Sequence, residues 1–419
     1  MPRYHIWTIG CQMNKAESER LASFLEQRGY RAAVRAESAD IIVLNSCVVR
    51  EHAENRVINK LHTIKPLKKL HPNLTLAVTG CLVDSNTEEM KKDFPHVDYF
   101  FKPGDFPSWL NETECSVFNM GQTLPRHPST SVYVPIIQGC DQFCSYCIVP
   151  YRRGREKSHP LAEIVCEVRE LVRRGVKEII LLGQNVDAYG HDLSENSDLA
   201  GLLGELNTVD DLVRLRFLTN HPKDMNAGLI DAVARLDKVC EQINLPVQSG
   251  SNTLLKVMGR GYTVERYREL IAELRQKIPG VALSTDVIVG FPSESEEQFR
   301  QTEDLLADLK FDTVHVAAYS IRPGTIAARE LKDDVPPEEK KRRLKVIEQL
   351  QVGIAAEINA RLLGQTVEVL VESKEKGKWR GRTRSDKLVF FGDQADRLGQ
   401  LVNVRVERTS PWSLQGKQH

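Results

Sequence analysis

The chain has 419 residues, of which 41% are hydrophobic and 27% charged, which suits two or three globular domains and excludes a disordered or fibrous protein. Its 57 Lys and Arg balance 57 Asp and Glu, so overall charge gives no argument for a nucleic-acid partner, and local patches must supply one. No apolar run approaches the length of a membrane span and no secretory pattern opens the chain, so we expect a cytoplasmic protein that does not contact a membrane.

Three short apolar runs near the N-terminus each end in a cysteine. The runs are 4–10, 41–45 and 74–80. Helix-patterned segments separate them, which predicts a βα domain with a parallel sheet. Cys11, Cys47 and Cys81 would then meet at the edge where parallel strands end. We hypothesise that they hold an iron–sulfur cluster with one iron free of protein ligands; the alternative is buried thiols that pack as small hydrophobes.

Residues from about 101 to 131 are rich in Pro, Gly and Ser, which predicts a linker. Its Cys115 has no partner spacing, so we expect a structural thiol there.

The segment 139–154, GCDQFCSYCIVPYRRG, carries Cys140, Cys144 and Cys147 in a C-x₃-C-x₂-C array. Three thiolates on so short a loop can hold three corners of an iron–sulfur cube and leave the fourth iron open to a substrate. A zinc ribbon would need a fourth ligand, and no further cysteine follows until Cys166. The spacing therefore favours a [4Fe-4S] cluster over its alternative, a structural zinc loop.

Six strand-like runs alternate with helical segments after the linker. They are 132–139, 178–184, 214–219, 242–248, 283–291 and 313–320. This pattern predicts an open (β/α)6 barrel, whose active-site residues lie on the loops that follow the strands. The cysteine loop follows the first strand, as that rule requires.

The C-terminal part changes character after a long predicted helix, about 338–363. Alternating apolar residues with Gly and Asp turns predict a small β-barrel. Residues 361–419 hold twelve Lys and Arg against seven Asp and Glu, and the basic residues interleave with an aromatic one. This mixture suits RNA phosphates and bases, so the predicted RNA contacts here are Lys378, Trp379, Arg380 and Arg382. The alternative is a solubilising β module.

Arg152 and Arg153 follow the cysteine loop directly and could grip phosphates of an RNA substrate. A plain solvated basic face is the alternative.

Several motifs resemble known families. The C-x₃-C-x-aromatic-C array, with Tyr146 as the aromatic residue, resembles the signature of radical S-adenosylmethionine enzymes. GCQMN at 10–14, NSCVVREHAENRV at 45–57 and TGC at 79–81 resemble the N-terminal domain of the methylthiotransferases, a subfamily with an auxiliary cluster. The C-terminal segment resembles the TRAM module, an RNA-binding barrel. The resemblance covers nearly the whole chain.

Within the methylthiotransferases, residues 12–14 together with Arg50 most resemble the branch that acts on isopentenylated adenosine in tRNA. Departures are Glu17 for the usual Asp, Ser46 for Thr, and Leu-Val-Asp at 82–84 for Met-Ala-Gln. They leave the cysteines intact and weaken only the substrate assignment.

The resemblance implies three domains, at 1–115, 126–356 and 357–419, two [4Fe-4S] clusters and S-adenosylmethionine. By family position, the candidates for contacts to S-adenosylmethionine are Tyr146, Gln184, Asn185, Gln248, Ser249 and Gly290. Amide and hydroxyl groups suit a ribose and an amino acid, and glycine lets the backbone approach closely; turn and capping duties are the alternative.

The implied activity is methylthiolation of C2 of N(6)-isopentenyladenosine next to the anticodon. S-adenosylmethionine would serve as methyl donor and as radical source, and a flavodoxin or ferredoxin would supply the electron to a monomeric enzyme. Within the enzyme class, the alternatives are threonylcarbamoyladenosine or a ribosomal-protein aspartate as substrate. Outside it, they are an electron-transfer iron–sulfur protein and a zinc-dependent RNA-binding protein.

Overall fold

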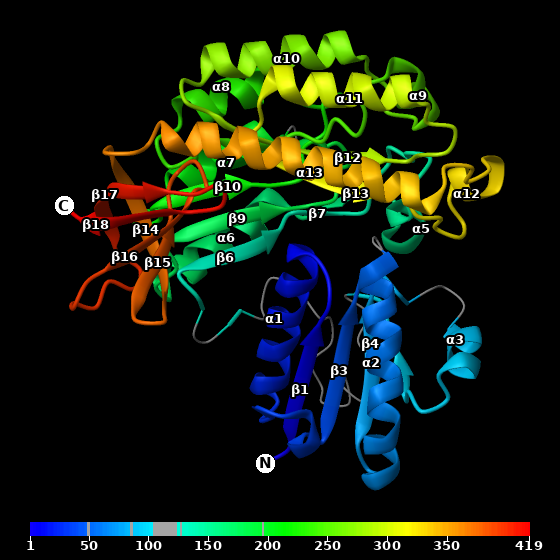
Figure 1. The fold of residues 1–419 in the computed structure, drawn as a ribbon. Coiled ribbons are helices and arrows are strands. Elements are labelled where there is room, and N and C mark those ends of the chain that lie inside the picture. The colour runs from blue at the N-terminus through cyan, green and yellow to red at the C-terminus, as the bar shows by residue number, and fades with distance from the viewer. Residues whose placement is uncertain (48–50, 84–86, 104–123, 126–127, 195–196) are drawn as a thin grey trace.

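The computed structural model describes residues 1–47, 51–83, 87–103, 124–125, 128–194 and 197–419. A blue N-terminal βα domain lies against a green and yellow central domain, and an orange-red barrel occupies the far end of the central domain (Figure 1). The fold class predicted from the sequence, a parallel-sheet domain, an open β/α barrel and a small C-terminal barrel, is confirmed.

The N-terminal domain is built on a parallel sheet with the order β2-β1-β3-β4-β5. The strands are β1 (Arg3–Thr8), β2 (Arg31–Ala32), β3 (Ile41–Ser46), β4 (Thr75–Gly80) and β5 (Tyr99–Phe100). The helices are α1 (Gln12–Gln27), α2 (Glu51–Leu70) and α3 (Thr87–Asp93). Every residue of β3 is buried, because Ile41 and Val43 pack in the α1 core while Ile42 and Leu44 pack in the α2 core. Alternate side chains of one strand thus serve two helical layers.

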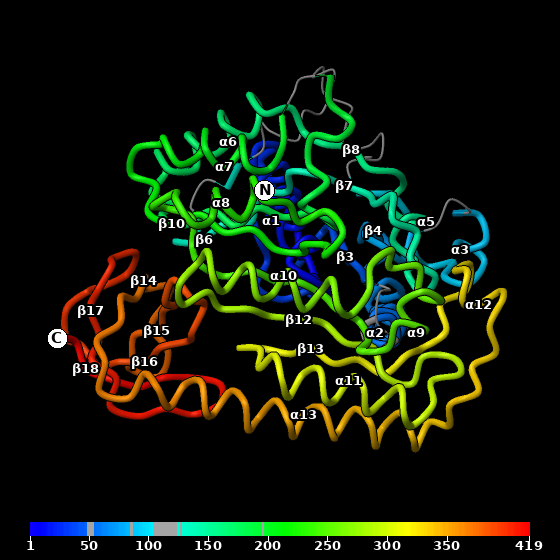
Figure 2. The backbone as a smooth tube through the Cα atoms, turned by 90° about the horizontal axis from the view of Figure 1, so that it is seen from above, coloured from blue at the N-terminus to red at the C-terminus, as the bar shows by residue number. Residues whose placement is uncertain are grey.

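The central domain contains two parallel three-stranded sheets, with the orders β6-β9-β10 and β11-β12-β13. The strands are β6 (Ser131–Pro135), β9 (Glu178–Leu182), β10 (Arg214–Phe217), β11 (Gln242–Asn244), β12 (Ala282–Val289) and β13 (Thr313–Ala318). A bridge between Leu215 and Val239 links the sheets, so the six strands follow one another around an open barrel, seen from above in Figure 2. All six predicted strands are present, although the first divides into β6 and β7 (Ile137–Gln138), which pairs with β8 (Lys157–Ser158).

Helices cover the outside of this half-barrel and bury one continuous apolar core. The longer ones are α6 (Leu161–Arg173), α7 (Leu199–Asn207), α8 (Ala227–Arg235), α10 (Val264–Lys277) and α11 (Glu296–Leu309). The short ones are α5 (Val149–Arg153), α9 (Asn252–Val257) and α12 (Ile326–Glu330). Ser295 and Gln298 form a capping box at the start of α11, which satisfies N–H groups that a helix end leaves open.

The connector helix α13 (Pro337–Ala360) runs along β13 and leads into a closed five-stranded barrel. Its strands are β14 (Thr366–Glu375), β15 (Lys378–Arg382), β16 (Leu388–Gly392), β17 (Leu401–Thr409) and β18 (Leu414–Gln418). Arg214, at the first position of β10, donates to the carbonyl oxygen of Arg382 over 2.6 Å. The barrel therefore docks at the N-terminal ends of the central strands, opposite the loops that carry the predicted active site.

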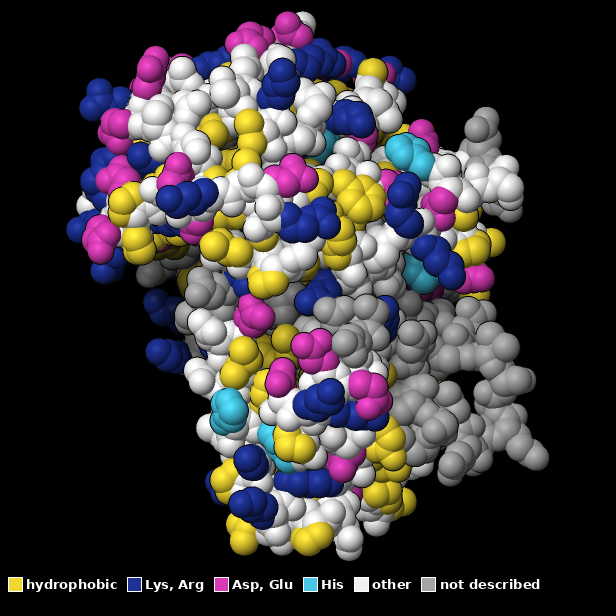
Figure 3. Space-filling model, turned by 90° about the vertical axis from the view of Figure 1, so that its right-hand side faces the viewer, with side chains coloured by type: hydrophobic (Ala, Val, Ile, Leu, Met, Phe, Trp, Pro, Cys, Tyr) yellow, Lys and Arg dark blue, Asp and Glu magenta, His cyan; other side chains and the backbone are white. Residues whose placement is uncertain are grey.

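Among the described residues, three ion pairs join the N-terminal and central domains. They are Arg20–Glu167 at 2.5 Å, Arg153–Glu17 at 2.6 Å and Arg322–Glu54 at 2.5 Å. In each pair the arginine side chain is less than a tenth exposed. On the outside, basic and acidic side chains intermingle over the face in Figure 3. Within the part of the chain that the structure describes, no helix is both long and apolar enough to cross a membrane.

Candidate active site and cluster ligands

The loop with Cys140, Cys144 and Cys147 is held at its base by close backbone contacts. Gly139 has a φ of +82°, and a Cβ there would lie 2.1 Å from the carbonyl oxygen of Arg155, so only glycine fits. The Gly139 N–H donates to Oε1 of Gln184, just after β9, over 2.6 Å. Gln184, predicted to contact S-adenosylmethionine, thus fixes where the loop begins.

Each sulfur of this loop accepts a hydrogen bond. Backbone N–H groups of Gln142 and Val149 donate to Cys140 and Cys147, and Nη1 of Arg260 lies 3.3 Å from Sγ of Cys144. Burial raises the pKa of Cys140 to about 11 and that of Cys147 to about 12. Thiols so buried ionise at neutral pH only with a positive charge beside them, which iron supplies. The donor set therefore fits a cluster with thiolate ligands.

The N-terminal cysteines lie where the strand pattern predicts. Cys11 is the N-cap residue of α1, and Cys47 and Cys81 directly follow β3 and β4. A Cβ on Gly10 would lie 2.8 Å from Cβ of Cys47, so the absence of a side chain lets the first two cysteine segments approach. Cys11 is exposed, whereas Cys47 and Cys81 are buried.

Asn14 ties these segments together. Its Nδ2 donates to Oδ1 of Asn45 over 2.7 Å and to the carbonyl oxygen of Ser46 over 3.0 Å. In return, Nδ2 of Asn45 donates to the carbonyl oxygen of Asn14. The amide pair locks the start of α1 to the end of β3. Arg50 and Cys115 lie outside the described residues.

One cysteine of the N-terminal triplet contacts the segment that follows the central cysteine loop, across the domain boundary. Cys81 packs against Ile148, which follows Cys147 directly, and Nε of Arg153 lies 3.2 Å from Sγ of Cys81. In the described ranges, no three His, Cys, Asp or Glu side chains are spaced to hold one metal ion.

The residues predicted to contact S-adenosylmethionine differ in their surroundings. Tyr146, within the cysteine loop, packs against an apolar cluster that includes Phe291 and Met258. Asn185 is buried and donates through Nδ2 to Oδ2 of Asp224, while its Oδ1 has no partner among the described residues. Gln248 adopts a φ of +71° and bridges to Val287 of β12, which holds its backbone in place.

Ser249 and Gly290 have structural partners. Ser249 is fully buried, and its hydroxyl lies 3.4 Å from that of Thr302 in α11. Gly290 has a φ of +67°, donates its N–H to Glu294, and a Cβ there would lie 2.3 Å from Cγ of Lys340. Both positions support the strand ends around the loop.

Two of the predicted RNA contacts are contradicted. The Arg153 side chain is 4% exposed and bonded to Glu17 and Cys81, so it offers no surface to a phosphate. Trp379 is 5% exposed in the barrel core, where Nε1 donates to the carbonyl oxygen of Ala395, so its ring cannot stack on a base. Arg152 is only partly exposed.

The other barrel candidates lie at the surface. Lys378 is exposed, while Arg380 and Arg382 are about one third exposed and form ion pairs with Glu375 and Asp386.

Sequence reasoning missed Arg260 and Asp224. Arg260 lies in the turn MGRGYT, 258–263, and the glycines on either side both have positive φ. A basic residue between two glycines was a signal for a tight turn that aims its side chain. Asp224 accepts bonds from Gln142 and Asn185, and only the fold brings these together.

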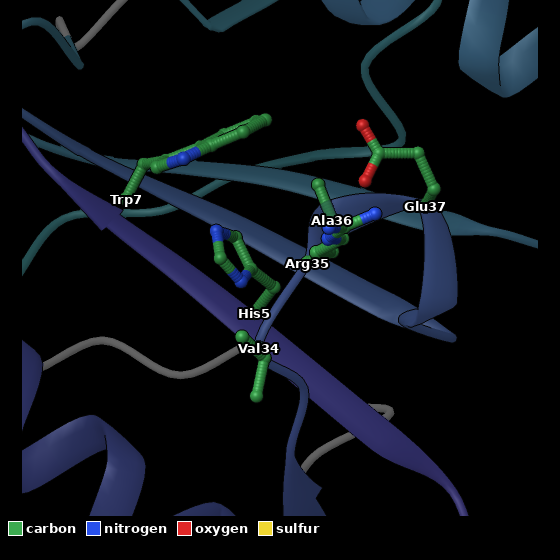
Figure 4. Close-up of a pocket in the computed structure, with 6 residues that line it drawn as sticks. All are labelled: His5, Trp7, Val34, Arg35, Ala36 and Glu37. Atoms are coloured by element: carbon green, nitrogen blue, oxygen red, sulfur yellow. The ribbon is translucent and has the colours of Figure 1, made fainter.

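A separate open hollow of about 500 Å³ lies on the N-terminal domain (Figure 4), and no cysteine is among the residues that line it. His5 and Trp7 of β1 and the segment 34–37 line it. None of the predicted site residues takes part.

Comparison with known families divides the chain in the same order. Residues 3–102 match uncharacterized protein family UPF0004, residues 134–306 match the radical SAM superfamily, and residues 360–418 match the TRAM domain. A tRNA-2-methylthio-N(6)-dimethylallyladenosine synthase from Dehalococcoides mccartyi strain CBDB1 is 55% identical over 417 residues, which cover 100% of this chain and 98% of the relative. The chain belongs to this synthase family. A synthase from Chloroflexus aurantiacus is 52% identical, over 99% of this chain and 91% of its own.

The fold of the synthase family is shared with distant solved structures. A radical S-adenosylmethionine methyltransferase from Kitasatospora setae, solved with cobalamin and a [4Fe-4S] cluster, superposes with a TM-score of 0.56 at 14% identity, over 91% of this chain and 81% of that one. The cobalamin-dependent radical enzyme OxsB gives a TM-score of 0.55 at 13% identity, over 84% and 56%. Radical SAM methylthiotransferases use S-adenosylmethionine and two [4Fe-4S] clusters, and two cysteine triplets are present here.

Proposed function

We propose that this protein methylthiolates C2 of N(6)-isopentenyladenosine next to the anticodon of tRNA, with S-adenosylmethionine as methyl donor and radical source. The names of its full-length relatives support the reaction and the substrate. The observation that carries the proposal is the contact of Cys81 with Ile148, the residue that follows Cys147. Chemistry divided between the two triplets would need them close together, and this contact across the domain boundary supports that arrangement.

Each triplet would hold one cluster, through Cys140, Cys144 and Cys147 or through Cys11, Cys47 and Cys81. When bound, the clusters and S-adenosylmethionine supply one-electron cleavage of the cofactor and a carrier for sulfur. The chain's own part is to place and shield these groups. Tyr146, within the loop, packs against an apolar cluster that includes Met258 and Phe291, and this cluster would keep water away from the bound cofactor.

Polar groups near the loop would orient the cofactor. The free Oδ1 of Asn185 is a buried acceptor that a ribose hydroxyl or an ammonium group would satisfy. Asp224 fixes this amide by accepting from its Nδ2 over 2.7 Å, and it also accepts from Gln142 inside the loop. The amide is therefore positioned relative to the cysteines.

The TRAM barrel would contribute phosphate contacts through Lys378, Arg380 and Arg382. The target base must be unpaired, as in an anticodon loop, because C2 of adenine faces inward in a duplex. We further propose domains at 1–115, 126–356 and 357–419, a monomer working in the cytoplasm, and flavodoxin or ferredoxin as electron donor.

Nucleoside analysis after reaction tests the proposal. The anaerobically reconstituted protein is mixed with reductant, S-adenosylmethionine and tRNA that carries isopentenyladenosine, and the digested nucleosides are examined by mass spectrometry. We expect the 2-methylthio product together with deoxyadenosine. Cys144→Ala should abolish both, whereas Cys81→Ala should abolish the thiolated product and spare deoxyadenosine formation.

One further substrate and the formation of deoxyadenosine decide between the alternatives. Product on tRNA with threonylcarbamoyladenosine, and none on isopentenyladenosine, would move the protein to the other tRNA branch. Deoxyadenosine that never forms under any condition would leave an electron-transfer protein as the better interpretation.

A further inference from the structure

Among the described residues, each cysteine triplet has a sulfur that accepts a hydrogen bond from a buried arginine. Nη1 of Arg260 lies 3.3 Å from Sγ of Cys144, and Nε of Arg153 lies 3.2 Å from Sγ of Cys81. Both guanidinium groups are almost wholly buried. Arg260 belongs to the same domain as its cysteine, whereas Arg153 reaches across from the central domain to the N-terminal one.

Arg153 is held by more than the sulfur. Its Nη1 donates to Oε1 of Glu17 over 2.6 Å, and Nη2 lies 3.4 Å from Oε2. Glu17 lies on α1, the helix that Cys11 caps, and α5, which carries Arg153, begins two residues after Cys147. One planar guanidinium therefore connects elements that carry ligands of both triplets, in a fork geometry that lysine cannot reproduce.

The charge of Arg153 acts directly on the sulfur. The guanidinium is always charged, and its Nε lies 3.2 Å from Sγ of Cys81. A hydrogen bond to a ligand sulfur also stabilises the more negative, reduced form of an iron–sulfur cluster, which raises its reduction potential. A buried cation has this effect most strongly, because little water screens it.

We propose that Arg153 is a positioning residue for the auxiliary cluster, defined as the cluster at Cys11, Cys47 and Cys81. It fixes Cys81 against the central domain and raises the reduction potential of that cluster. The inference rests on the proposed function, since it requires a cluster at each triplet. Arg260 provides a matched comparison, because it makes the same kind of bond to the other triplet.

Redox titration followed by electron paramagnetic resonance tests this. Two full-length variants each keep one cluster. In the first background, alanine replaces Cys140, Cys144 and Cys147, so the auxiliary cluster remains. In the second background, alanine replaces Cys11, Cys47 and Cys81, so the cluster of the central loop remains. In the first background we expect Arg153→Met to lower the midpoint potential or to lose the cluster, and Arg260→Met to change neither. In the second background, Arg260→Met should lower the midpoint potential of the remaining cluster or lose that cluster, and Arg153→Met should change neither.

The conservative variant guards against a folding defect. Arg153→Lys keeps the charge but not the fork. The midpoint potential of its auxiliary cluster should therefore lie between those of wild type and Arg153→Met. If Arg153→Met loses the cluster, Arg153→Lys should retain part of it. The inference is overturned if neither Arg153→Met nor Arg153→Lys changes the midpoint potential of the auxiliary cluster. It is also overturned if these substitutions shift the midpoint potentials of both clusters equally. Wild-type protein with only about four irons per chain, the content of one cluster, would instead overturn the proposed function.

Discussion

Replacing Arg216 by methionine should loosen the C-terminal barrel from the central domain. Arg216 in β10 is 3% exposed and donates through Nε to Oε1 of Glu178 over 2.8 Å. Its two terminal nitrogens donate to the carbonyl oxygens of Arg384 and Thr383 in the barrel, each over 2.7 Å. Methionine fills similar apolar volume without any donor. Glu178 would then keep only Ser131 as a side-chain donor among the described residues.

The cost follows from what is left behind. The two hydrogen bonds from Arg216 to the barrel carbonyls cross the interface, and bonds to a charged group are worth about 1.5–3 kcal/mol each. We therefore expect the free energy of undocking to fall by about 3–6 kcal/mol, which raises the undocked population roughly a hundredfold to ten-thousandfold at ~1.4 kcal/mol per factor of ten. Glu178 adds to the cost, since removing one partner of a buried ion pair costs about 3–5 kcal/mol and leaves the remaining charge uncompensated.

Native-state hydrogen exchange read by mass spectrometry measures this locally. Peptides from 366–418 should exchange faster in Arg216→Met, while peptides from β3 in the N-terminal sheet should not change. The double variant Arg216→Met with Glu178→Met should recover part of the loss, because no unpaired charge remains buried. Unchanged exchange in the barrel, or an equal increase in β3, would refute the reasoning.

Three further predictions concern single side chains. Trp379→Ala should lower the free energy of unfolding of the barrel, measured in urea, by about 3–5 kcal/mol, because the ring lies in the core. Its neighbour Lys378 is at the surface, so Lys378→Ala should leave stability unchanged and should weaken tRNA binding and its salt dependence. Gly290→Ala should lower the melting temperature, since a positive φ for a non-glycine residue costs about 1–3 kcal/mol and the Lys340 side chain must move; unchanged melting would show that the turn relaxes. Burial lowers the pKa of His221 from 6.5 to about 2, and the charges of Arg260 and Lys223 contribute to this decrease. Between these two pH values, His221 is protonated in the unfolded chain and neutral in the folded chain. Unfolding free energy should then fall as pH drops below about 6.5, less steeply in His221→Gln, as urea titrations at several pH values would show.

The sequence was sufficient for features with a local pattern. The six central strands and the three N-terminal ones were predictable because β-branched and apolar runs of strand length lie between helical repeats, and all of them formed. Cys11, Cys47 and Cys81 were placed correctly because parallel strands end at one edge. A residue's position along a strand is a local property, so no partner had to be known.

Arg153 was misassigned because its partner lies far away in the chain. Arg153 and Glu17 are separated by 136 positions, and the contact of Arg216 with Arg384, which the sequence did not predict, spans 168. Next to Arg152 and Gly154, Arg153 looks like part of an exposed basic patch, and only the fold shows the carboxylate that buries it. Trp379 was misread for a related reason, since alternation shows that a strand has two faces but not which one is inside.

These buried charges also account for how the domains are arranged. An apolar interface tolerates small displacements, because dispersion and burial change gradually as surfaces slide. An ion pair such as Arg20–Glu167 does not, since a shift that separates the charges leaves both desolvated and uncompensated. Arg153–Glu17 and Arg322–Glu54 impose the same restriction at two other points of the boundary. Three such restraints fix one body relative to another, which is what chemistry divided between two cysteine triplets on separate domains requires.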